Sequence, residues 1–313
     1  MMGNVWSVLG MTLAMTACAT LPESTDAPAE ILMQGERLHP ESITSDARGT
    51  LYIGSNPGTV FRAFAGDPVA VPWIVPDETN GLQTVFGVLV DQPRGLLWVC
   101  SNAMGGEGET AIKSFSLYTG DLATSYPLAV EGPAMCNDMT VAPNGDVYAS
   151  ETTGGRILVL RNGGRQFEHW ATDPEFASLD GISFGPGGEL YANAIQRNTL
   201  LRVHRNADGS FARAEVLETS APLSGPDGLR PLDDTRMLQS EGNAGTITVL
   251  TFAEGQPVQV EVIAEGIDYA SSVTMVGDHA WYPEGKLRFM FGPDAGEDPG
   301  PFVVRSAPIP PAD

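Results

Sequence analysis

Four oxygen-bearing residues stand at the same place in a recurring stretch of this sequence, two positions ahead of an apolar residue that opens an alternating segment. They are Glu41, Asn137, Asp180 and Asp227. An all-oxygen set without His or Cys suits a hard divalent cation. Carboxylates held ~4 Å apart repel by roughly 4 kcal/mol at an effective dielectric of 20, so they either take up protons or bind a cation. These residue types indicate a cation site if the fold brings the four positions together.

A purely structural role is the alternative for each residue taken alone. Asp180-Gly181 and Asp227-Gly228 are common turn dipeptides, and Asp at the start of a strand often accepts hydrogen bonds from backbone N–H groups. Their shared position in the repeat favours the cation site over this alternative.

The recurring stretch is a strand, a tight turn and a second strand, and it appears six times. Its apolar anchors follow one another at intervals of 43 to 51 residues: Ile43, Val88, Met139, Ile182, Leu229 and Val273. This period is the length of a four-stranded propeller blade. Two packed β-sandwiches, the alternative all-β architecture, would not produce six copies in phase.

A third alternating strand is expected after each hairpin. The six expected third strands are residues 59–62, 111–115, 156–160, 199–203, 246–250 and 286–290. A fourth strand follows in most copies, for example at 258–263. Closure of the ring is expected to pair residues 30–33 with the last blade, next to residues 302–305. The sequence therefore predicts an all-β, six-bladed β-propeller of four-stranded antiparallel blades.

A propeller explains how residues so far apart in the chain would meet. The first strand of each blade lines the central channel, so residues at its start converge on one mouth. The six residues at this position are Glu41, Phe86, Asn137, Asp180, Asp227 and Ser271. We expect three carboxylates and one amide to surround a common axis there.

The repeat resembles the gluconolactonase and senescence marker protein family, which is related to the paraoxonases. The likeness rests on Glu41, on Cys136-Asn137-Asp138, on Leu179-Asp180-Gly181 and on Pro226-Asp227-Gly228, and it covers about residues 30 to 308. In that family a Glu, two Asn and an Asp hold a divalent metal. Glu41, Asn137 and Asp227 match this set, whereas Asp180 replaces the second Asn.

The resemblance implies metal-assisted hydrolysis of a lactone or ester, with Asp227 as the general base. Ca²⁺ is the expected metal, and Mg²⁺, Mn²⁺ and Zn²⁺ are alternatives. A non-catalytic propeller, stabilised by the metal and binding a ligand or protein, is the second hypothesis, because one fold hosts many functions.

The expected substrate is a small molecule, a neutral or apolar lactone or ester. Sugar lactonases of the family place an Arg where this chain has Met135, and Phe86 adds a second apolar side chain at the mouth. Ser271 and His39 are weaker candidates for the same pocket. For His39, a structural role at the surface or at a strand end is the alternative.

Composition excludes several kinds of partner. Acids outnumber bases 39 to 17 and the formal charge is -22, which argues against nucleic acid and against an anionic membrane surface. With 42% hydrophobic residues the chain can form a core. We expect a monomer.

The N-terminus has the features of an export signal. Residues 5–17 are apolar and precede Cys18 and a Pro/Ser/Thr-rich stretch, which resembles a bacterial lipoprotein signal with Cys18 as the lipidated residue. An ordinary cleaved signal is the alternative. The expected division is a signal at 1–18, a tether at 19–29, the propeller at 30–308 and a tail at 309–313. The protein would then be periplasmic and held at the membrane through a lipid anchor alone. In such a compartment Cys100 and Cys136 either pair or remain two buried thiols.

Overall fold

The computed structural model describes residues 30–104 and 108–312. The expected signal, Cys18 and the tether therefore lie outside the described residues. Within them, no helix has the length and apolar character needed to cross a membrane.

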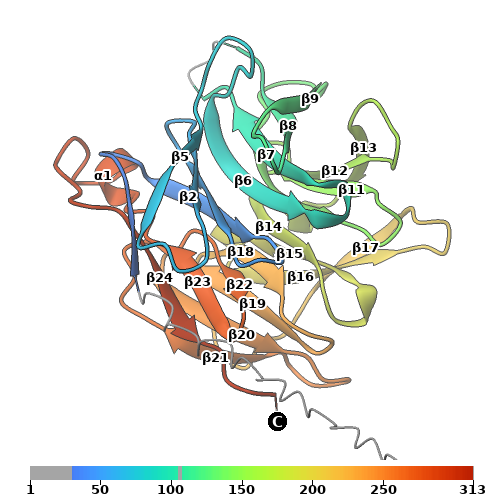
Figure 1. Cartoon of the computed structure of the whole chain (residues 1–313). Coiled ribbons are helices and arrows are strands. Elements are labelled where there is room, and N and C mark those ends of the chain that lie inside the picture. Colours follow the sequence, from blue (N-terminus) through green and yellow to red (C-terminus); the bar gives the residue numbers. More distant parts are fainter. Residues whose placement is uncertain (1–29, 105–107, 313) are drawn as a thin grey trace, which may run out of the picture.

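The described chain forms a β-propeller whose blades follow one another in sequence order around a central channel (Figure 1). Four blades are separate four-stranded sheets. Blade 2 contains β6 (Thr84–Asp91), β7 (Leu96–Asn102), β8 (Ala111–Ser116) and β9 (Leu122–Pro127). Blade 3 contains β10 (Cys136–Val141), β11 (Val147–Glu151), β12 (Arg156–Leu160) and β13 (Glu168–Thr172). Blade 4 contains β14 (Leu179–Phe184), β15 (Leu190–Ala194), β16 (Thr199–Arg205) and β17 (Phe211–Val216). Blade 5 contains β18 (Pro226–Pro231), β19 (Arg236–Glu241), β20 (Thr246–Thr251) and β21 (Gln259–Ala264).

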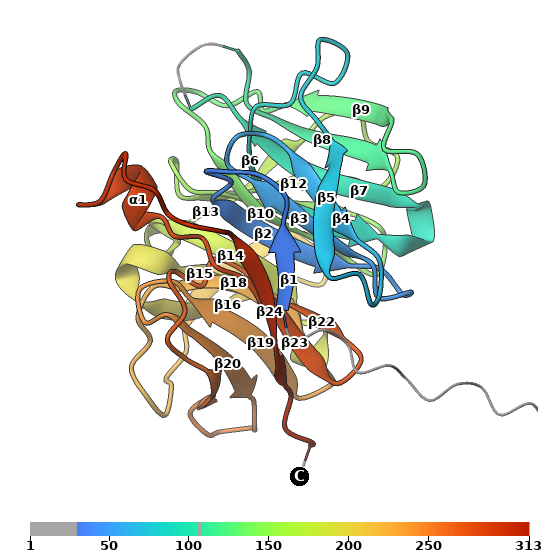
Figure 2. The same ribbon diagram turned by 60° about the vertical axis from the view of Figure 1, so that its left-hand side comes forward.

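The first and last blades are joined in one eight-stranded sheet. Blade 1 contains β2 (Pro40–Ser45), β3 (Leu51–Ser55), β4 (Val60–Ala63) and β5 (Val69–Ile74). Blade 6 contains β22 (Thr274–Val276), β23 (His279–Pro283), β24 (Val303–Pro308) and, as its outermost strand, β1 (Glu30–Met33). β1 pairs antiparallel with β24 through Ile31 and Val304, and parallel with β5 at Leu32 and Val69. Figure 2 shows β1 between these two strands. The expected closure of the ring by the N-terminal strand is confirmed.

One expected strand is wrong. Residues 286–290 do not form the third strand of blade 6; a short helix α1 (Arg288–Phe291) lies there, and β24 is the third strand. Lys286 has a left-handed backbone (φ 50°), and its Nζ donates to the carbonyls of Pro299 and Pro301. This arrangement turns the chain out of the blade, and Phe302 and Val304 provide the buried side chains that a third strand needs.

Short 3-10 turns complete the secondary structure. They are η1 (Gln92–Arg94), η2 (Pro174–Phe176), η3 (Pro186–Gly188) and η4 (Ile195–Arg197).

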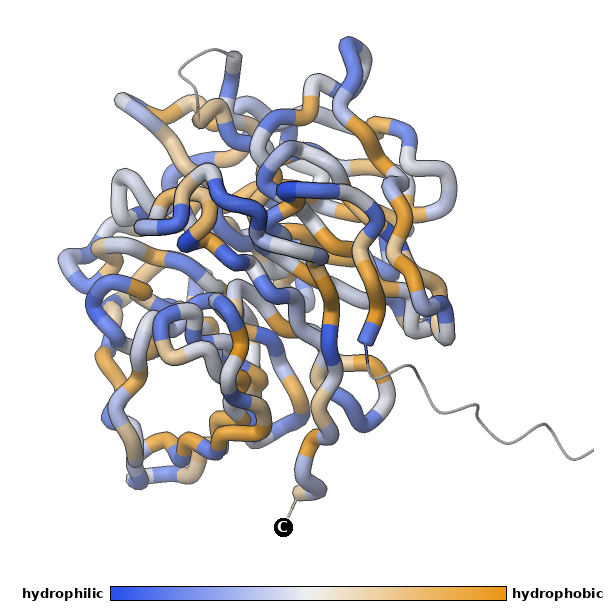
Figure 3. Tube along the Cα trace, turned by 90° about the vertical axis from the view of Figure 1, so that its left-hand side faces the viewer, coloured by the Kyte–Doolittle hydropathy of each residue, from blue (hydrophilic) through white to orange (hydrophobic). Residues whose placement is uncertain are grey.

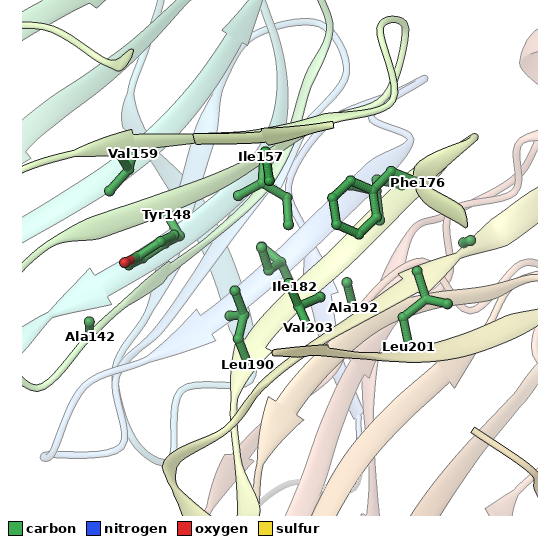
Figure 4. Close-up of a cluster of buried hydrophobic side chains, with 13 residues drawn as sticks. Ala142, Tyr148, Ile157, Val159, Phe176, Ile182, Leu190, Ala192, Leu201 and Val203 are labelled. Carbon is green, nitrogen blue, oxygen red and sulfur yellow. The ribbon is translucent and has the colours of Figure 1, made fainter. Parts of the chain in front are cut away.

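The hydrophobic core is divided among the contacts between neighbouring blades. The described residues contain six buried clusters, and each lies between two successive blades, the last closing blade 6 against blade 1. Figure 4 shows the cluster between blades 3 and 4, where Tyr148 and Ile157 face Ile182 and Leu190. Hydrophobic segments follow the strands, while most turns are hydrophilic (Figure 3). Burial on both faces of each sheet holds the inner strands in fixed positions.

Cys100 and Cys136 form a disulfide between β7 and β10, with Cα atoms 5.3 Å apart. Of the two alternatives that the sequence left open, the structure has the pair. The bond joins blades 2 and 3 immediately before Asn137.

Candidate functional site

A β-bulge interrupts the innermost strand of each of blades 1 to 5 near its start. The pairing of β10 with β11 skips from Cys136 to Met139, and the same shift occurs in β2, β6, β14 and β18. A bulge leaves an extra residue out of the ladder and redirects its side chain. The residues freed in this way include all four predicted cation ligands.

The bulged ends of these strands meet around one small cavity, which we call the acidic cavity. Residues from all six blades line it: Glu41, Ser42, Gly87, Asn137, Asp138, Asp180, Asp227, Gly228, Ser271 and Ser272. Its volume of about 10 Å³ for a water-sized sphere matches one water molecule or one ion. The structure thus brings the four predicted ligands together on the channel axis.

Two glycines allow the inner strands to approach so closely. A Cβ at Gly87 would lie 2.3 Å from the carbonyl oxygen of Asn137, and one at Gly181 would lie 2.2 Å from that of Asp227. Any larger residue would push neighbouring blades apart at the point where the ligands meet.

Direct contacts link three of the four ligands. Asn137 Nδ2 donates to Asp180 Oδ2 at 3.0 Å. A hydrogen bond between the carboxyl groups of Asp180 and Asp227 lowers the pKa of Asp180 and raises that of Asp227. Glu41 interacts with Asp180 through charge, and a side-chain hydrogen bond with Asn56 lowers its pKa.

The carboxylates are electrostatically unfavourable where they lie. Burial, followed by the negative charge of Asp180, raises the pKa of Glu41 to about 8. Burial likewise raises the pKa of Asp180 to about 7, and burial together with the charges of Asp180 and Glu41 raises the pKa of Asp227 well above its usual value. Oε2 of Glu41 and Oδ2 of Asp227 are shielded from solvent and have no hydrogen-bond partner among the described residues.

The unsatisfied oxygens of Glu41 and Asp227 are of the type that a divalent cation binds. An all-oxygen donor set around an ion-sized cavity suits a hard cation. However, no group of three or more His, Cys, Asp or Glu side chains in residues 30–104 and 108–312 lies close enough to form a metal site. The donor types therefore fit a hard cation, although the acidic side chains of these ranges do not by themselves form a three-ligand group.

The weaker pocket candidates are spread over several places. Ser271 lines the acidic cavity and its Oγ donates to the carbonyl of Pro40 at 3.0 Å. Phe86 is buried in the core between blades 2 and 3, with Met135 at the edge of the same cluster. His39 is buried against Phe302, and its Nδ1 lies 3.1 Å from the carbonyl oxygen of Gly285. None of Phe86, Met135 and His39 lines the acidic cavity.

A buried ion pair below the acidic cavity was not anticipated from the sequence. Arg230 of blade 5 reaches across the channel to Asp138 of blade 3, with Nη1–Oδ2 and Nη2–Oδ1 distances of 2.6 and 2.9 Å. The repeat carried the signal. In the six copies of the repeat, the residue that follows the position of Glu41 is Gly or Ser in every copy except blade 3, where it is Asp138. The residue three places after that position is uncharged in every copy except blade 5, where it is Arg230.

Tyr269 is a second residue that the sequence analysis missed. It has a left-handed backbone (φ 66°), which is rare for a bulky side chain. Burial raises the pKa of its phenol, as do the charges of Asp227, Glu41 and Asp180 and a hydrogen bond with Asp227. Gly242 leaves room for the ring, since a Cβ there would lie 2.7 Å from it. Tyr269 thus interacts directly with Asp227, and no sequence motif marked it.

Comparison with known proteins identifies the fold. No family model and no curated protein sequence matches the chain. Among solved structures, it is similar to a candidate gluconolactonase (TM-score 0.63, 16% identity, 91% of this chain and 93% of that one). It is also similar to regucalcin, described as a calcium-binding protein, from Agrobacterium tumefaciens (0.62, 17%, 91% and 96%) and to a streptogramin B lyase (0.60, 17%, 90% and 87%). At these identities the likeness establishes the β-propeller fold.

Proposed function

We propose that the acidic cavity binds a divalent cation, most readily Ca²⁺, and that the protein hydrolyses a lactone or ester at this site. The observation that carries the proposal is the pair of buried, unpartnered oxygens, Glu41 Oε2 and Asp227 Oδ2, facing an ion-sized cavity. Buried carboxylates without partners are costly, and a cation removes that cost. The similarity to a calcium-binding propeller and to a candidate gluconolactonase supports the same reading.

Glu41, Asn137, Asp180 and Asp227 would hold the cation. The bound cation would supply Lewis-acid polarisation of the substrate carbonyl. Asp227 would accept the proton of the attacking water, and Asn137 would orient Asp180 through its amide hydrogen bond. Ser271, anchored to Pro40, would contribute a hydroxyl at the wall of the cavity.

The size of the cavity favours a second candidate function. At about 10 Å³, it has room for an ion alone, and a lactone or ester would have to reach that ion from outside the cavity. The alternative is a non-catalytic propeller in which the cation rigidifies the channel. The two candidates share the cation and differ in catalysis.

The test combines metal analysis with a substrate panel. Protein purified without chelator is analysed for metals and assayed with neutral lactones and aryl esters. We expect close to one divalent cation per chain, and hydrolysis that chelation abolishes. Asp227→Asn should lower kcat/KM at least about 100-fold, the usual contribution of a general base.

Asp278→Asn is the matched control, because this aspartate lies on a turn of blade 6 with its side chain 90% exposed. It should leave activity unchanged. A cation bound with no hydrolysis across the panel would support the non-catalytic propeller. Absence of any bound divalent cation at millimolar concentration would refute both candidates.

A further inference from the structure

A larger cavity lies at the opposite end of the channel, where the inner strands finish and turn back. We call it the turn-end pocket. Its volume is about 560 Å³, within the range of pockets that bind small organic molecules. It is formed by the ends of β6, β10, β14 and β18, with the adjoining turns of blades 2 and 3. It shares no lining residue with the acidic cavity.

The walls of the turn-end pocket are mostly apolar. Leu89 and Val90 come from β6, Val141 from β10 and Phe184 from β14, and all four side chains are half-buried. Such a surface on rigid strands remains exposed at a cost unless something covers it. An apolar molecule entering between blades 2 and 4 would remove these side chains from water.

Arg230 provides the polar group of the pocket. Its side chain is 8% exposed, and both of its terminal nitrogens are committed to Asp138. Its Nε is buried and has no hydrogen-bond partner within the described part of the chain. A buried donor without an acceptor is costly. An oxygen of a molecule bound in the pocket is the acceptor that this donor lacks.

The lining of the turn-end pocket is less acidic than that of the other large cavity on the neighbouring blades. Two arginines line the pocket, and each is paired with an acid: Arg94 with Asp91 and Arg230 with Asp138. The lining is therefore close to neutral, although acids outnumber bases 39 to 17 in the whole chain. By contrast, the cavity of about 620 Å³ between blades 4 and 5 is lined by Glu189, Glu215, Glu218 and Glu254 with a single arginine. The turn-end pocket is therefore the cavity better suited to a negatively charged molecule.

We infer that the turn-end pocket binds a small, mainly apolar organic acid, with its anionic group toward Arg230 and its apolar part against Leu89, Val141 and Phe184. The inference stands apart from the proposed cation site and hydrolysis, because the two cavities lie at different ends of the channel.

The test uses anilinonaphthalene sulfonate, an apolar aromatic anion whose fluorescence reports an apolar environment. The folded, full-length protein should bind it saturably at one site. Val141→Trp fills the pocket and should weaken binding at least about tenfold, the equivalent of about 1.4 kcal/mol. Met275→Trp is the matched control, because Met275 holds the corresponding place in blade 6, is 37% exposed and does not line the pocket. It should bind the probe as the parent protein does.

Two further measurements separate anion recognition from simple apolar binding. Phenylnaphthylamine, which lacks the sulfonate, should bind at least about tenfold more weakly than the anion. Arg230→Lys keeps a charge opposite Asp138 but loses the planar guanidinium, and it should weaken binding of the anion several-fold while leaving that of the neutral probe unchanged.

Hydrogen exchange locates the site. Saturation with the anion should slow exchange in peptides covering residues 89–95 and 139–145. Protection at residues 252–258 instead, or equal binding by Val141→Trp and Met275→Trp, would overturn the inference. Equal affinity for the charged and neutral probes would overturn its anionic part, and absence of binding would overturn it entirely.

Discussion

Two carboxylates that line the same cavity have opposite environments. Asp138 follows Asn137 in the bulge of β10 and faces the guanidinium of Arg230, which binds both of its oxygens. Its Oδ2 also accepts a hydrogen bond from the backbone N–H of Ile182. Asp227, three residues before Arg230 in sequence, faces Asp180 and Glu41 instead and retains an unpartnered oxygen.

The difference shows that burial alone does not define a functional carboxylate. Both residues are 4% exposed. The charge of Asp138 is balanced within the protein, so the pair is a structural bridge between blades 3 and 5. The charge around Asp227 is not balanced by a facing cation of the described chain, and such a cluster requires protons or an external ion.

The largest expected effect comes from breaking the balanced pair. Arg230→Met leaves Asp138 buried without its counter-ion, and we expect a loss of about 3–5 kcal/mol of unfolding free energy. For a domain of this size that corresponds to a drop in Tm of roughly 6–20 °C. Thermal denaturation followed by circular dichroism measures it.

Arg213→Met is the control for this substitution, because Arg213 forms an exposed ion pair with Glu215. Its loss should change stability by about 1 kcal/mol or less. If Arg230→Met were no more harmful than Arg213→Met, Asp138 and Arg230 would not form the bridge that we describe.

A smaller effect should follow from supplying the missing cation to the acidic cavity. Ca²⁺ at about 100 times its Kd should stabilise the native state by about 2.7 kcal/mol. The expected rise in Tm is roughly 5–11 °C. Differential scanning calorimetry of chelated and Ca²⁺-loaded protein makes the comparison, with Asp227→Asn as the variant that should lose the response. An equal rise in this variant would place the cation elsewhere.

The unfolding free energy of the metal-free protein should also depend on pH, and its change per pH unit should be smaller than the stabilisation by Ca²⁺. The pKa values of Glu41 and Asp180 are about 8 and about 7 in the folded protein, above those of the free side chains. Between the unfolded and folded pKa values the native state binds more protons than the unfolded state, so stability falls as pH rises. One extra bound proton gives a slope of about 1.4 kcal/mol per pH unit.

Denaturant midpoints of chelated protein between about pH 5 and about pH 8 test this slope. Ca²⁺ should flatten it, because the bound cation replaces the protons. A midpoint that rises with pH across this range in the chelated protein would contradict the unbalanced charge of the cluster.

Much of the fold could be predicted because each blade repeats the same local signals. Alternating apolar residues and glycine turns gave six hairpins in phase, and the structure has an inner strand at each. The error at residues 286–290 arose because alternation there matched a strand pattern, while the backbone of Lys286 and the long loop after it depend on contacts with Pro299 and Pro301. Such contacts between distant residues leave no periodic mark.

The repeat in the sequence therefore determined the propeller and placed Glu41, Asn137, Asp180 and Asp227 at equivalent positions, since equivalent positions in a closed ring face one axis. The tertiary structure decided the direction, the spacing and the charge balance of the side chains at those positions. Bulges redirect the side chains, Gly87 and Gly181 permit close contact, and Arg230 neutralises Asp138 but leaves Asp227 unbalanced. The physical reason is that charge balance depends on distances across the channel, between residues about 90 positions apart such as Asp138 and Arg230. Periodicity along the chain does not encode those distances.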